Sequence, residues 1–441
     1  MQSEQKRFLI QHIFLNCSVN CRKKMKCCSG KLQYRKRKRM KQNNHWYSRR
    51  HRFRKGIGVF ALIFSLLLWE VPQVLVKAAE ELTLESAAAV LMEGSTGTIL
   101  YEKEATKELR PASITKVMTL LLIFEALNAG TIALTDMVSV SEHAASMGGS
   151  QVYLEAYETQ TVETMIKCIS IASANDASVA MAEFLAGSEE AFVTKMNQRA
   201  KELGMNHTNF VNCYGLDTDG HYSCALDVAL MSRELIMNHP EISNYSTVWM
   251  DTFVHTTSKG QSEFGLTNTN KLIKSYQGIT GLKTGSTGLA KYCLSATARR
   301  DDMNLIAVIM AAPDTKTRFR EAAKLLDYGY ATASLYQEDF STTEFPEVKV
   351  KAGVKQSVQV RPKKSFGYLC NKDMVQGDIR MELQLNEEVL APVTGGMSLG
   401  RAIFYYGEQE LGSVELLAVE AVEKMKYKDA LKTVWGCFFG S

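Results

Sequence analysis

Three short polar motifs stand in a fixed order along this chain, and they constrain its fold more than any other feature. They are Ser113-Ile114-Thr115-Lys116, Ser173-Ala174-Asn175 and Lys283-Thr284-Gly285. Together they supply a hydroxyl nucleophile, an amine base, a proton relay and a group that binds an anion, which serine-based acyl transfer without a histidine requires. These groups act together only in one pocket, so the sequence predicts a fold that brings three distant stretches of chain into contact.

The first motif provides the candidate nucleophile and its base. Ser113 and Lys116 are three residues apart, so on a helix both side chains lie on one face within hydrogen-bond reach. An apolar stretch from about Ser113 to Ala129 follows Pro111 and predicts such a helix, whose positive end favours negative charge on Ser113. Burial and the nearby charge of Lys283 would lower the pKa of Lys116 enough for it to accept a proton. Because Ser-x-x-Lys occurs about twice by chance in a chain of this length, the spacing alone does not identify Ser113 and Lys116 as a catalytic pair.

The second and third motifs provide the candidate proton relay and the substrate-binding groups. The Ser173 hydroxyl can pass a proton to a leaving amine, and the Asn175 amide can hold a substrate carbonyl. On an edge strand, Lys283 offers a charge for a carboxylate, Thr284 a hydroxyl beside it, and Gly285 room for a close backbone approach. Ser-Ala-Asn alone is more typical of a helix-terminal polar cluster than of a catalytic site. Lys-Thr-Gly is rarer, since by chance only about one chain of this length in ten contains it. The order of all three motifs favours the catalytic interpretation.

Apolar periodicity predicts a mixed helix and sheet domain around these motifs. A hairpin is expected over Ala87–Tyr101, and residues from about 140 to 260 are expected to be mainly helical. The clearest helices are Ile166–Phe184, Leu226–Met237 and Arg318–Tyr330, and the clearest later strands are Thr280–Lys283, Tyr292–Ala298 and Leu305–Met310. Beyond about Tyr336 short alternating segments predict a small all-β domain over residues 337–420. These segments are Val348–Val350, Ser357–Val360, Met381–Leu385 and Ser413–Leu416.

The first 79 residues predict export. Residues 1–55 hold 18 of the 52 Lys and Arg residues and one of the 47 acids, so the rest of the chain carries a net charge of −12. That acidic remainder argues against nucleic-acid binding. The run Gly56–Trp69 has 14 residues, too short to span a membrane and typical of a secretory signal, with cleavage expected after Val76-Lys77-Ala78. An uncleaved anchor is the alternative.

The last stretch, residues 421–441, predicts an amphipathic helix that lies in a membrane interface. Apolar and aromatic side chains fall on one helical face and lysines flank it. The apolar face holds Tyr427, Leu431, Val434, Trp435 and Phe438, and the lysines are Lys424, Lys428 and Lys432. A C-terminal helix docked on the β domain is the alternative.

Other chemistries find little support in the sequence. The histidines of the exported part stand in no nucleophile-elbow context and are expected to be surface or hydrogen-bonded structural residues. They are His143, His207, His221, His239 and His255. The chain contains no His-Glu-x-x-His, phosphate-binding loop or dinucleotide fingerprint, so neither a metal nor a cofactor is predicted.

With these motifs the chain resembles the serine D-alanyl-D-alanine carboxypeptidases, among the low-molecular-mass penicillin-binding proteins. The likeness covers roughly residues 80–440 and extends to the segments around the motifs. These are Arg110–Thr119, Ser173–Ala177, Gly215–Asp217 and Gly281–Gly285. It implies an α+β fold of the β-lactamase and transpeptidase kind over residues 80–336, an antiparallel sheet flanked by helices with a helical subdomain. The small all-β domain and the terminal amphipathic helix complete it.

The resemblance also implies a mechanism. Ser113 attacks the carbonyl between two D-alanines of a peptidoglycan stem peptide, Lys116 takes the proton, and Ser173 with Lys283 passes one to the departing D-alanine. Lys283 and Thr284 engage the terminal carboxylate, and the backbone amides of Ser113 and Ser286 form the oxyanion hole. β-Lactams acylate the same serine, and the enzyme works at the outer face of the cytoplasmic membrane.

Two positions depart from the family pattern. Ser286 stands where a bulkier side chain is common, and Thr267–Asn270 lacks the arginine that some relatives carry there. We therefore expect Arg318 or Arg320 to help bind the carboxylate.

Three other functions remain open from the sequence. A β-lactamase would need a carboxylate that activates the deacylating water. Glu202 and Glu234 each stand four residues before an asparagine, but the residues after Glu234 are typical of a plain helix. An inactive envelope-binding protein would require a damaged site, whereas all three motifs are intact. A nucleic-acid binder would depend on the basic leader alone.

Overall fold

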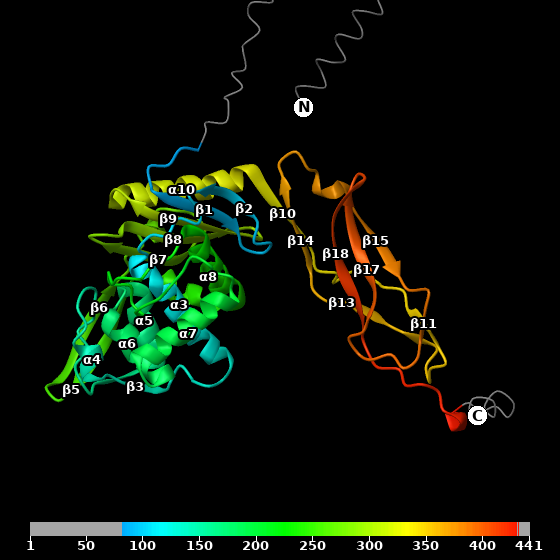
Figure 1. Ribbon diagram of the computed structural model, residues 1–441, viewed down its shortest axis with the longest axis horizontal. Helices are drawn as coiled ribbons and strands as arrows, with labels where there is room; N and C mark the ends of the chain where they lie inside the picture. The colour runs from blue at the N-terminus through cyan, green and yellow to red at the C-terminus, as the bar shows by residue number, and fades with distance from the viewer. Residues whose placement is uncertain (1–81, 430, 432–441) are drawn as a thin grey trace, which may run out of the picture. The chain divides into compact units, whose positions relative to one another are not determined.

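The computed structural model of the chain describes residues 82–429 and residue 431. Its larger part is built on one five-stranded antiparallel sheet with the strand order β2-β1-β9-β8-β7 (Figure 1). The strands are β1 (Ala88–Glu93), β2 (Ile99–Lys103), β7 (Ile279–Thr287), β8 (Lys291–Arg300) and β9 (Met303–Ala312). The strand β7, which carries Lys283-Thr284-Gly285, lies at one edge of this sheet, as the sequence predicts.

Helices cover both faces of this sheet. The helix α10 (Thr315–Thr332) packs on β8 and β9, while α8 (Ala225–Asn238) packs on β1 and β9 from the other side (Figure 1). Every residue of β1 is buried. Because neither face meets water, the central strands are continuous apolar runs without the usual alternation.

The helix α3 (Lys116–Asn128) lies at the centre of the helical subdomain, against α6 (Asn175–Ala186), α7 (Glu189–Glu202) and α8. A helix that is apolar on nearly all sides is stable only when other elements surround it. The turn before it, Ala112–Thr115, is a 3₁₀ helix, so Ser113 precedes the α-helix that the sequence predicts to include it.

The helix predicted over Ile166–Phe184 is wrong in its middle. The helix α5 (Val162–Lys167) continues into a π-helical turn over Cys168–Ala172, and α6 begins only at Asn175. Between them Ser173 adopts a left-handed backbone with φ 63°. Apolar residues keep their helical spacing across this break, and one residue with positive φ leaves no trace in such a pattern.

The prediction that residues 140–260 are mainly helical is only partly right. The strand β5 (Met250–Thr257) lies in this range and forms an exposed hairpin with β6 (Gly260–Thr267). A smaller hairpin joins β3 (Met137–Ser139) to β4 (Thr159–Thr161). These strands bury few side chains, so their sequences lack the alternation that identifies a half-buried strand. The shorter helices are α4 (Glu142–Ala145), η3 (Pro240–Ile242), α9 (Ser243–Ser246) and η4 (Lys271–Lys274).

The C-terminal part is β-structured apart from the 3₁₀ turn η5 (Gln376–Asp378) and a helical segment at residues 427–429 and 431, among the residues that the structure describes there. It contains a two-stranded, a three-stranded and a four-stranded sheet, with orders β10-β14, β12-β11-β16 and β13-β18-β17-β15. Side chains from these sheets share one core, in which Phe366 stacks on Phe404 at 3.8 Å. The strands are β10 (Ala333–Glu338), β11 (Val348–Lys351), β12 (Ser357–Val358), β13 (Val360–Pro362), β14 (Phe366–Asn371), β15 (Ile379–Leu385), β16 (Glu388–Leu390), β17 (Ser398–Tyr406) and β18 (Gln409–Ala418).

The predicted α+β class with a small all-β part is therefore confirmed. The leader predicted over residues 1–79 lies outside the described residues. In the segment 421–441, predicted to be an amphipathic helix, residues 421–426 are not helical, because Val422 bridges to Val393 and Lys424 to Gly353. Residues 427–429 and 431 are helical, and residues 430 and 432–441 lie outside the described part. Among the helices within 82–429, none combines the length and the hydropathy that crossing a bilayer requires.

Candidate active site

The fold brings the three motifs together at the start of α3. The Nζ atom of Lys116 lies 3.4 Å from Ser113 Oγ and 2.6 Å from Asn175 Oδ1. From the edge strand β7, Lys283 Nζ donates to Ser173 Oγ at 2.8 Å. The hydroxyls and amines named from the sequence thus form two hydrogen-bonded sets, Ser113–Lys116–Asn175 and Ser173–Lys283, and the two amines are close enough for the charge of Lys116 to act on Lys283. Ser113 itself is half-buried, while both amines are buried.

Lys116 has the surroundings of a neutral amine. Burial lowers its pKa to about 7, against weaker opposing effects of Cys213 and Asp176. A neutral amine has two hydrogens, and two carbonyl oxygens are in place to accept them: Asn175 Oδ1 at 2.6 Å and the Tyr214 backbone oxygen at 2.8 Å. Its lone pair is then free to face Ser113 Oγ and to accept the hydroxyl proton.

Lys283 is the second buried amine. It donates to Ser173 Oγ and, at 3.1 Å, to the Thr284 backbone oxygen. Burial lowers its pKa well below the ordinary value, and the positive charges of Lys116 and Arg318 add to that effect. An anionic group that entered the site would reverse this shift, because opposite charge favours the protonated amine.

Gly285 allows β7 to lie directly against the turn Ala112–Thr115, which carries Ser113. A Cβ atom at this position would come within 2.9 Å of the Pro111 oxygen and of the Ser113 nitrogen. We predict from sequence that this glycine leaves room for a substrate; in the structure the space is taken by the protein's own backbone. The contact brings the Ser113 amide beside the strand that carries exposed Ser286. The neighbouring Thr284 hydroxyl shares a hydrogen bond of 2.6 Å with Thr269.

The two arginines that the sequence offers for the carboxylate lie in different places. Arg318 is buried behind β7 and donates from Nη1 to the backbone oxygens of Gly285 at 3.0 Å and Cys293 at 3.2 Å. Its buried Nε has no hydrogen-bond partner. Arg320 is exposed and pairs with Glu85. Arg318 is thus the one of the two that adds positive charge next to Lys283.

Asn175 is held by the loop of residues 146–158. Its side-chain Nδ2 donates to the Gly148 oxygen and its backbone amide to the Ser150 oxygen, both at 2.7 Å. A Cβ atom on Gly149, which has φ +81°, would lie 2.9 Å from that same Nδ2. The orientation of Asn175 toward Lys116 therefore depends on the path of this loop.

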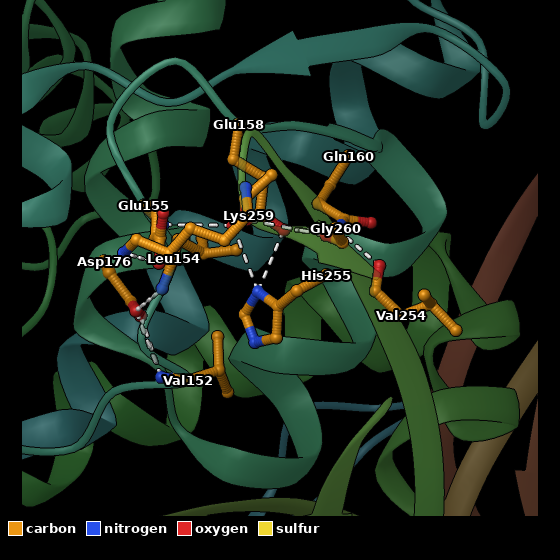
Figure 2. Close-up of polar contacts among 11 residues, drawn as sticks. Val152, Leu154, Glu155, Glu158, Gln160, Asp176, Val254, His255, Lys259 and Gly260 are labelled. Atoms are coloured by element: carbon orange, nitrogen blue, oxygen red, sulfur yellow. Dashed lines mark hydrogen bonds and ion pairs between the residues drawn. The ribbon is translucent and has the colours of Figure 1, made fainter. Parts of the chain in front are cut away.

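Two buried carboxylates fix that path, as Figure 2 shows. Asp176 accepts hydrogen bonds from the backbone amides of Val152 at 3.0 Å and Leu154 at 3.1 Å. Burial raises the pKa of Asp176, and the same amides counteract that rise. Farther along the loop, Glu158 contacts Nδ1 of His255 on β5 at 2.9 Å.

The sequence interpretation missed both carboxylates. The only available signal was that Asp176 directly follows the motif residue Asn175. His255 is the hydrogen-bonded structural residue that one of the two sequence alternatives describes.

Glu202 and Glu234, the carboxylates considered above for activating a deacylating water, have another partner. Glu234 and Glu202 both bind Arg199, at 2.6 Å and 3.4 Å, and Glu125 contacts the same guanidinium at 2.7 Å. These acids stabilise the packing of α7, α8 and α3. Within the described part of the chain, no cluster of three or more His, Cys, Asp or Glu residues could hold a metal ion.

Comparison with known proteins gives consistent likenesses across both parts of the chain. Residues 75–314 match the family described as D-alanyl-D-alanine carboxypeptidase, and residues 330–424 match the C-terminal domain of penicillin-binding protein 5. The D-alanyl-D-alanine carboxypeptidase DacF of Bacillus subtilis (strain 168) is 42% identical over 363 residues, which are 82% of this chain and 92% of that protein. The D-alanyl-D-alanine carboxypeptidase DacC of Escherichia coli (strain K12) is 31% identical over 79% of this chain and 87% of its own length.

Among solved structures, penicillin-binding protein 5 from Haemophilus influenzae matches with a TM-score of 0.66 at 29% identity. The match covers 78% of this chain and 98% of that one. The likeness extends over the part with the three motifs and over the all-β part.

Proposed function

The chain belongs to the D-alanyl-D-alanine carboxypeptidase family, and from this premise we propose that Ser113 is its nucleophile and Lys116 the base. The protein is a serine peptidase of the low-molecular-mass penicillin-binding class and acts on peptidoglycan in cell-wall formation. One observation supports the residue assignment above all: the buried Lys116 amine faces Ser113 Oγ while two carbonyl oxygens accept its hydrogens.

In the acylation step that we propose, the Ser113 oxygen attacks the carbonyl carbon between the two terminal D-alanines. The hydroxyl proton goes to neutral Lys116, and the backbone amides of Ser113 and Ser286 hold the developing oxyanion. The carbon–nitrogen bond then breaks, and the proton that Lys116 received passes by way of Ser173 and Lys283 to the nitrogen of the departing D-alanine, which leaves Lys116 neutral. These two already share a hydrogen bond of 2.8 Å, which supports this route.

Water completes the reaction by hydrolysing the ester on Ser113. Lys116, again neutral, takes a proton from that water, and the proton returns to the serine oxygen when the shortened stem peptide leaves. Asn175 supports the substrate in the same scheme. One hydrogen of its side-chain amide is donated to Gly148, so the second remains for a substrate carbonyl.

The terminal carboxylate is assigned to Lys283, Thr284 and Gly285 on β7, with Arg318 behind the strand. Arg318 donates to the Gly285 oxygen and so adds charge without leaving the interior. This arrangement replaces the arginine that the segment Thr267–Asn270 lacks.

The assignment extends to partners and location. The substrates are peptidoglycan stem peptides, and β-lactams are inhibitors that acylate Ser113. The apolar run Gly56–Trp69 supports export, and the pattern of residues 421–441 supports attachment to the outer face of the cytoplasmic membrane. The domain limits that we propose are 1–79, 80–336, 337–420 and 421–441. The matches over residues 75–314 and 330–424 support the division into a first and a second folded part, and the pairing of β10 and the burial of Val422 extend the second part slightly beyond 337–420 at both ends.

The test is the release of D-alanine from a peptide that ends in D-Ala-D-Ala. We expect Ser113→Ala to reduce that release at least about 10³-fold, since the covalent route is lost. Ser258→Ala is the matched control, because Ser258 is exposed in the turn between β5 and β6 and has no role in the proposed reaction. Release by Ser113→Ala at the wild-type rate would refute the assignment.

A further inference from the structure

A second loop, residues 209–221, also contacts the Ala112–Thr115 turn that carries Ser113. Its Cys213 oxygen accepts a hydrogen bond of 2.6 Å from Thr119 of α3, and its Tyr214 oxygen accepts the bond from Lys116 described above. Gly215, with φ +93°, touches the turn so closely that a Cβ atom would lie 1.9 Å from the Ala112 oxygen. In the reaction proposed above, this loop has no role beyond these backbone contacts.

The same loop ends at a buried histidine, His221, which is 3% exposed. Its Nδ1 accepts a hydrogen bond from the Val211 amide at 3.0 Å, and its Nε2 lies 2.8 Å from the Thr115 hydroxyl oxygen. Thr115 donates its single hydroxyl hydrogen to the Ala112 oxygen at 2.9 Å. Nε2 must therefore carry the ring proton and donate to Thr115, because Nδ1 is already an acceptor.

These bonds form one directed chain that ends on the residue before the nucleophile. The Val211 amide donates to His221, His221 to Thr115, and Thr115 to the carbonyl of Ala112. Ala112 has φ +50°, a conformation that a residue with a side chain adopts only when its surroundings enforce it. Any relaxation of Ala112 would rotate the turn that carries Ser113.

We propose that His221 is a positioning residue for acylation: as the Nε2–H tautomer it directs the Thr115 hydroxyl onto the Ala112 carbonyl and so holds Ser113 toward Lys116. The proposal rests on the assignment of Ser113 as the nucleophile. His221 does not touch the reacting atoms, and it acts through Thr115 alone.

The charge state of His221 agrees with this role. Burial lowers its pKa to about 4, the charge of Arg110 acts in the same direction, and Asp217 opposes both. The ring is therefore neutral at neutral pH, as a residue that accepts at one nitrogen and donates at the other must be.

Two substitutions test the roles of the two ring nitrogens of His221 separately. His221→Gln keeps an amide donor near the position of Nε2, and His221→Asn keeps an acceptor near the position of Nδ1. We expect the Gln variant to be acylated by a fluorescent penicillin within about threefold of the wild-type rate constant. The Asn variant should be slower by about tenfold or more, because a misplaced nucleophile is costly.

The control is His207→Gln, since the His207 side chain is 43% exposed and lies 3.6 Å from Glu108. It should be acylated within about twofold of wild type. Equal losses in the Gln and Asn variants, in step with their thermal stability, would overturn the proposal, since a merely structural histidine predicts that outcome.

A double-mutant cycle with Thr115→Val tests whether His221 acts through Thr115. Once the hydroxyl is gone, adding His221→Asn should slow acylation by less than about twofold more. Full additivity of the two effects would contradict the coupling.

Nitrogen NMR of the wild-type protein tests the tautomer without any substitution. At pH 6–8 the proton of His221 should be on Nε2, and a proton on Nδ1 would refute the proposal even if every variant failed to fold. Ser113→Ala separates this proposal from the proposed function: acylation that survives Ser113→Ala rejects the nucleophile. Normal acylation of His221→Asn rejects only the role of His221.

Discussion

At the scale of single residues, the site contains two buried amines whose pKa values burial lowers. Lys116 has two carbonyl acceptors for its hydrogens, and Lys283 has the Ser173 hydroxyl and a backbone oxygen. A buried lysine without a carboxylate partner is unfavourable for folding, because its charged form loses hydration. The chain tolerates this cost at the site where a neutral amine is needed as a base.

The lowered pKa of Lys116 predicts the pH dependence of acylation. Below about 7 the amine becomes protonated, so the second-order rate constant with a penicillin should fall about tenfold per pH unit, and above it the constant should level off. Stopped-flow acylation over a pH series measures it. A rate that is independent of pH through this range would contradict the role of Lys116.

The same shift makes a second prediction, about stability. The pKa of Lys116 in the folded protein, about 7, lies below the ordinary lysine value of 10.5, so the unfolded chain binds more protons between these values. This group therefore makes the free energy of unfolding rise with pH across that window. In Lys116→Met, urea titrations at several pH values should show a smaller rise than in wild type. An unchanged slope would show that Lys116 does not titrate in this window.

Gly285 gives a prediction about backbone packing. Gly285→Ala would place a methyl group within 2.9 Å of the Ser113 nitrogen, so we expect acylation to slow about 100-fold while the protein stays folded. Gly288→Ala, three residues along the same segment, is the matched control, because nothing lies within 4 Å of its added Cβ. Similar acylation by both variants would show that β7 can move away from the turn.

At the scale of elements, the loop of residues 146–158 illustrates how buried carboxylates can order a segment without regular structure. Asp176 at the start of α6 binds two amides of this loop, and Glu158 ties its far end to the β5–β6 hairpin through His255 (Figure 2). The loop in turn orients Asn175 through its backbone oxygens. The order of this loop and the orientation of Asn175 therefore depend on the same contacts.

Removing the Asp176 carboxylate should affect both stability and activity. Asp176→Ala leaves the Val152 and Leu154 amides buried without an acceptor, which we expect to lower the free energy of unfolding by about 2–4 kcal/mol. Acylation should slow as Asn175 loses its support. Glu155→Gln removes only an exposed ion pair to Lys259 and should change stability by less than about 1 kcal/mol. Equal denaturation midpoints for the two variants would contradict this account.

The sequence predicted some of these elements well and others poorly, for identifiable reasons. The three motifs, the central strands and α3 carry local patterns, so both their type and their convergence were predictable. The left-handed Ser173 and the exposed strand β5 carry none. The anchors Asp176 and Glu158 have partners far away along the chain or in another element, and only the folded structure reveals such pairs.

At the scale of the whole molecule, the proposed membrane attachment makes a prediction about residues 427–441. Truncation after Lys426 keeps Val422, which is buried in the core of the β part. We expect the truncated protein to lose binding to vesicles that contain phosphatidylglycerol, while D-alanine release from a soluble peptide stays within about twofold. Co-sedimentation with the vesicles measures the first effect. Unchanged binding would favour the docked-helix alternative.

The central claim is that folding makes Ser113 a nucleophile through an amine, and one measurement tests it most directly. The protein is incubated with benzylpenicillin, its intact mass is recorded, and the modified residue is mapped by peptide sequencing. The account predicts one stable penicilloyl group per chain, on Ser113, and none on Ser113→Ala. An adduct on another residue, rapid turnover of the penicillin, or no adduct at all would contradict it.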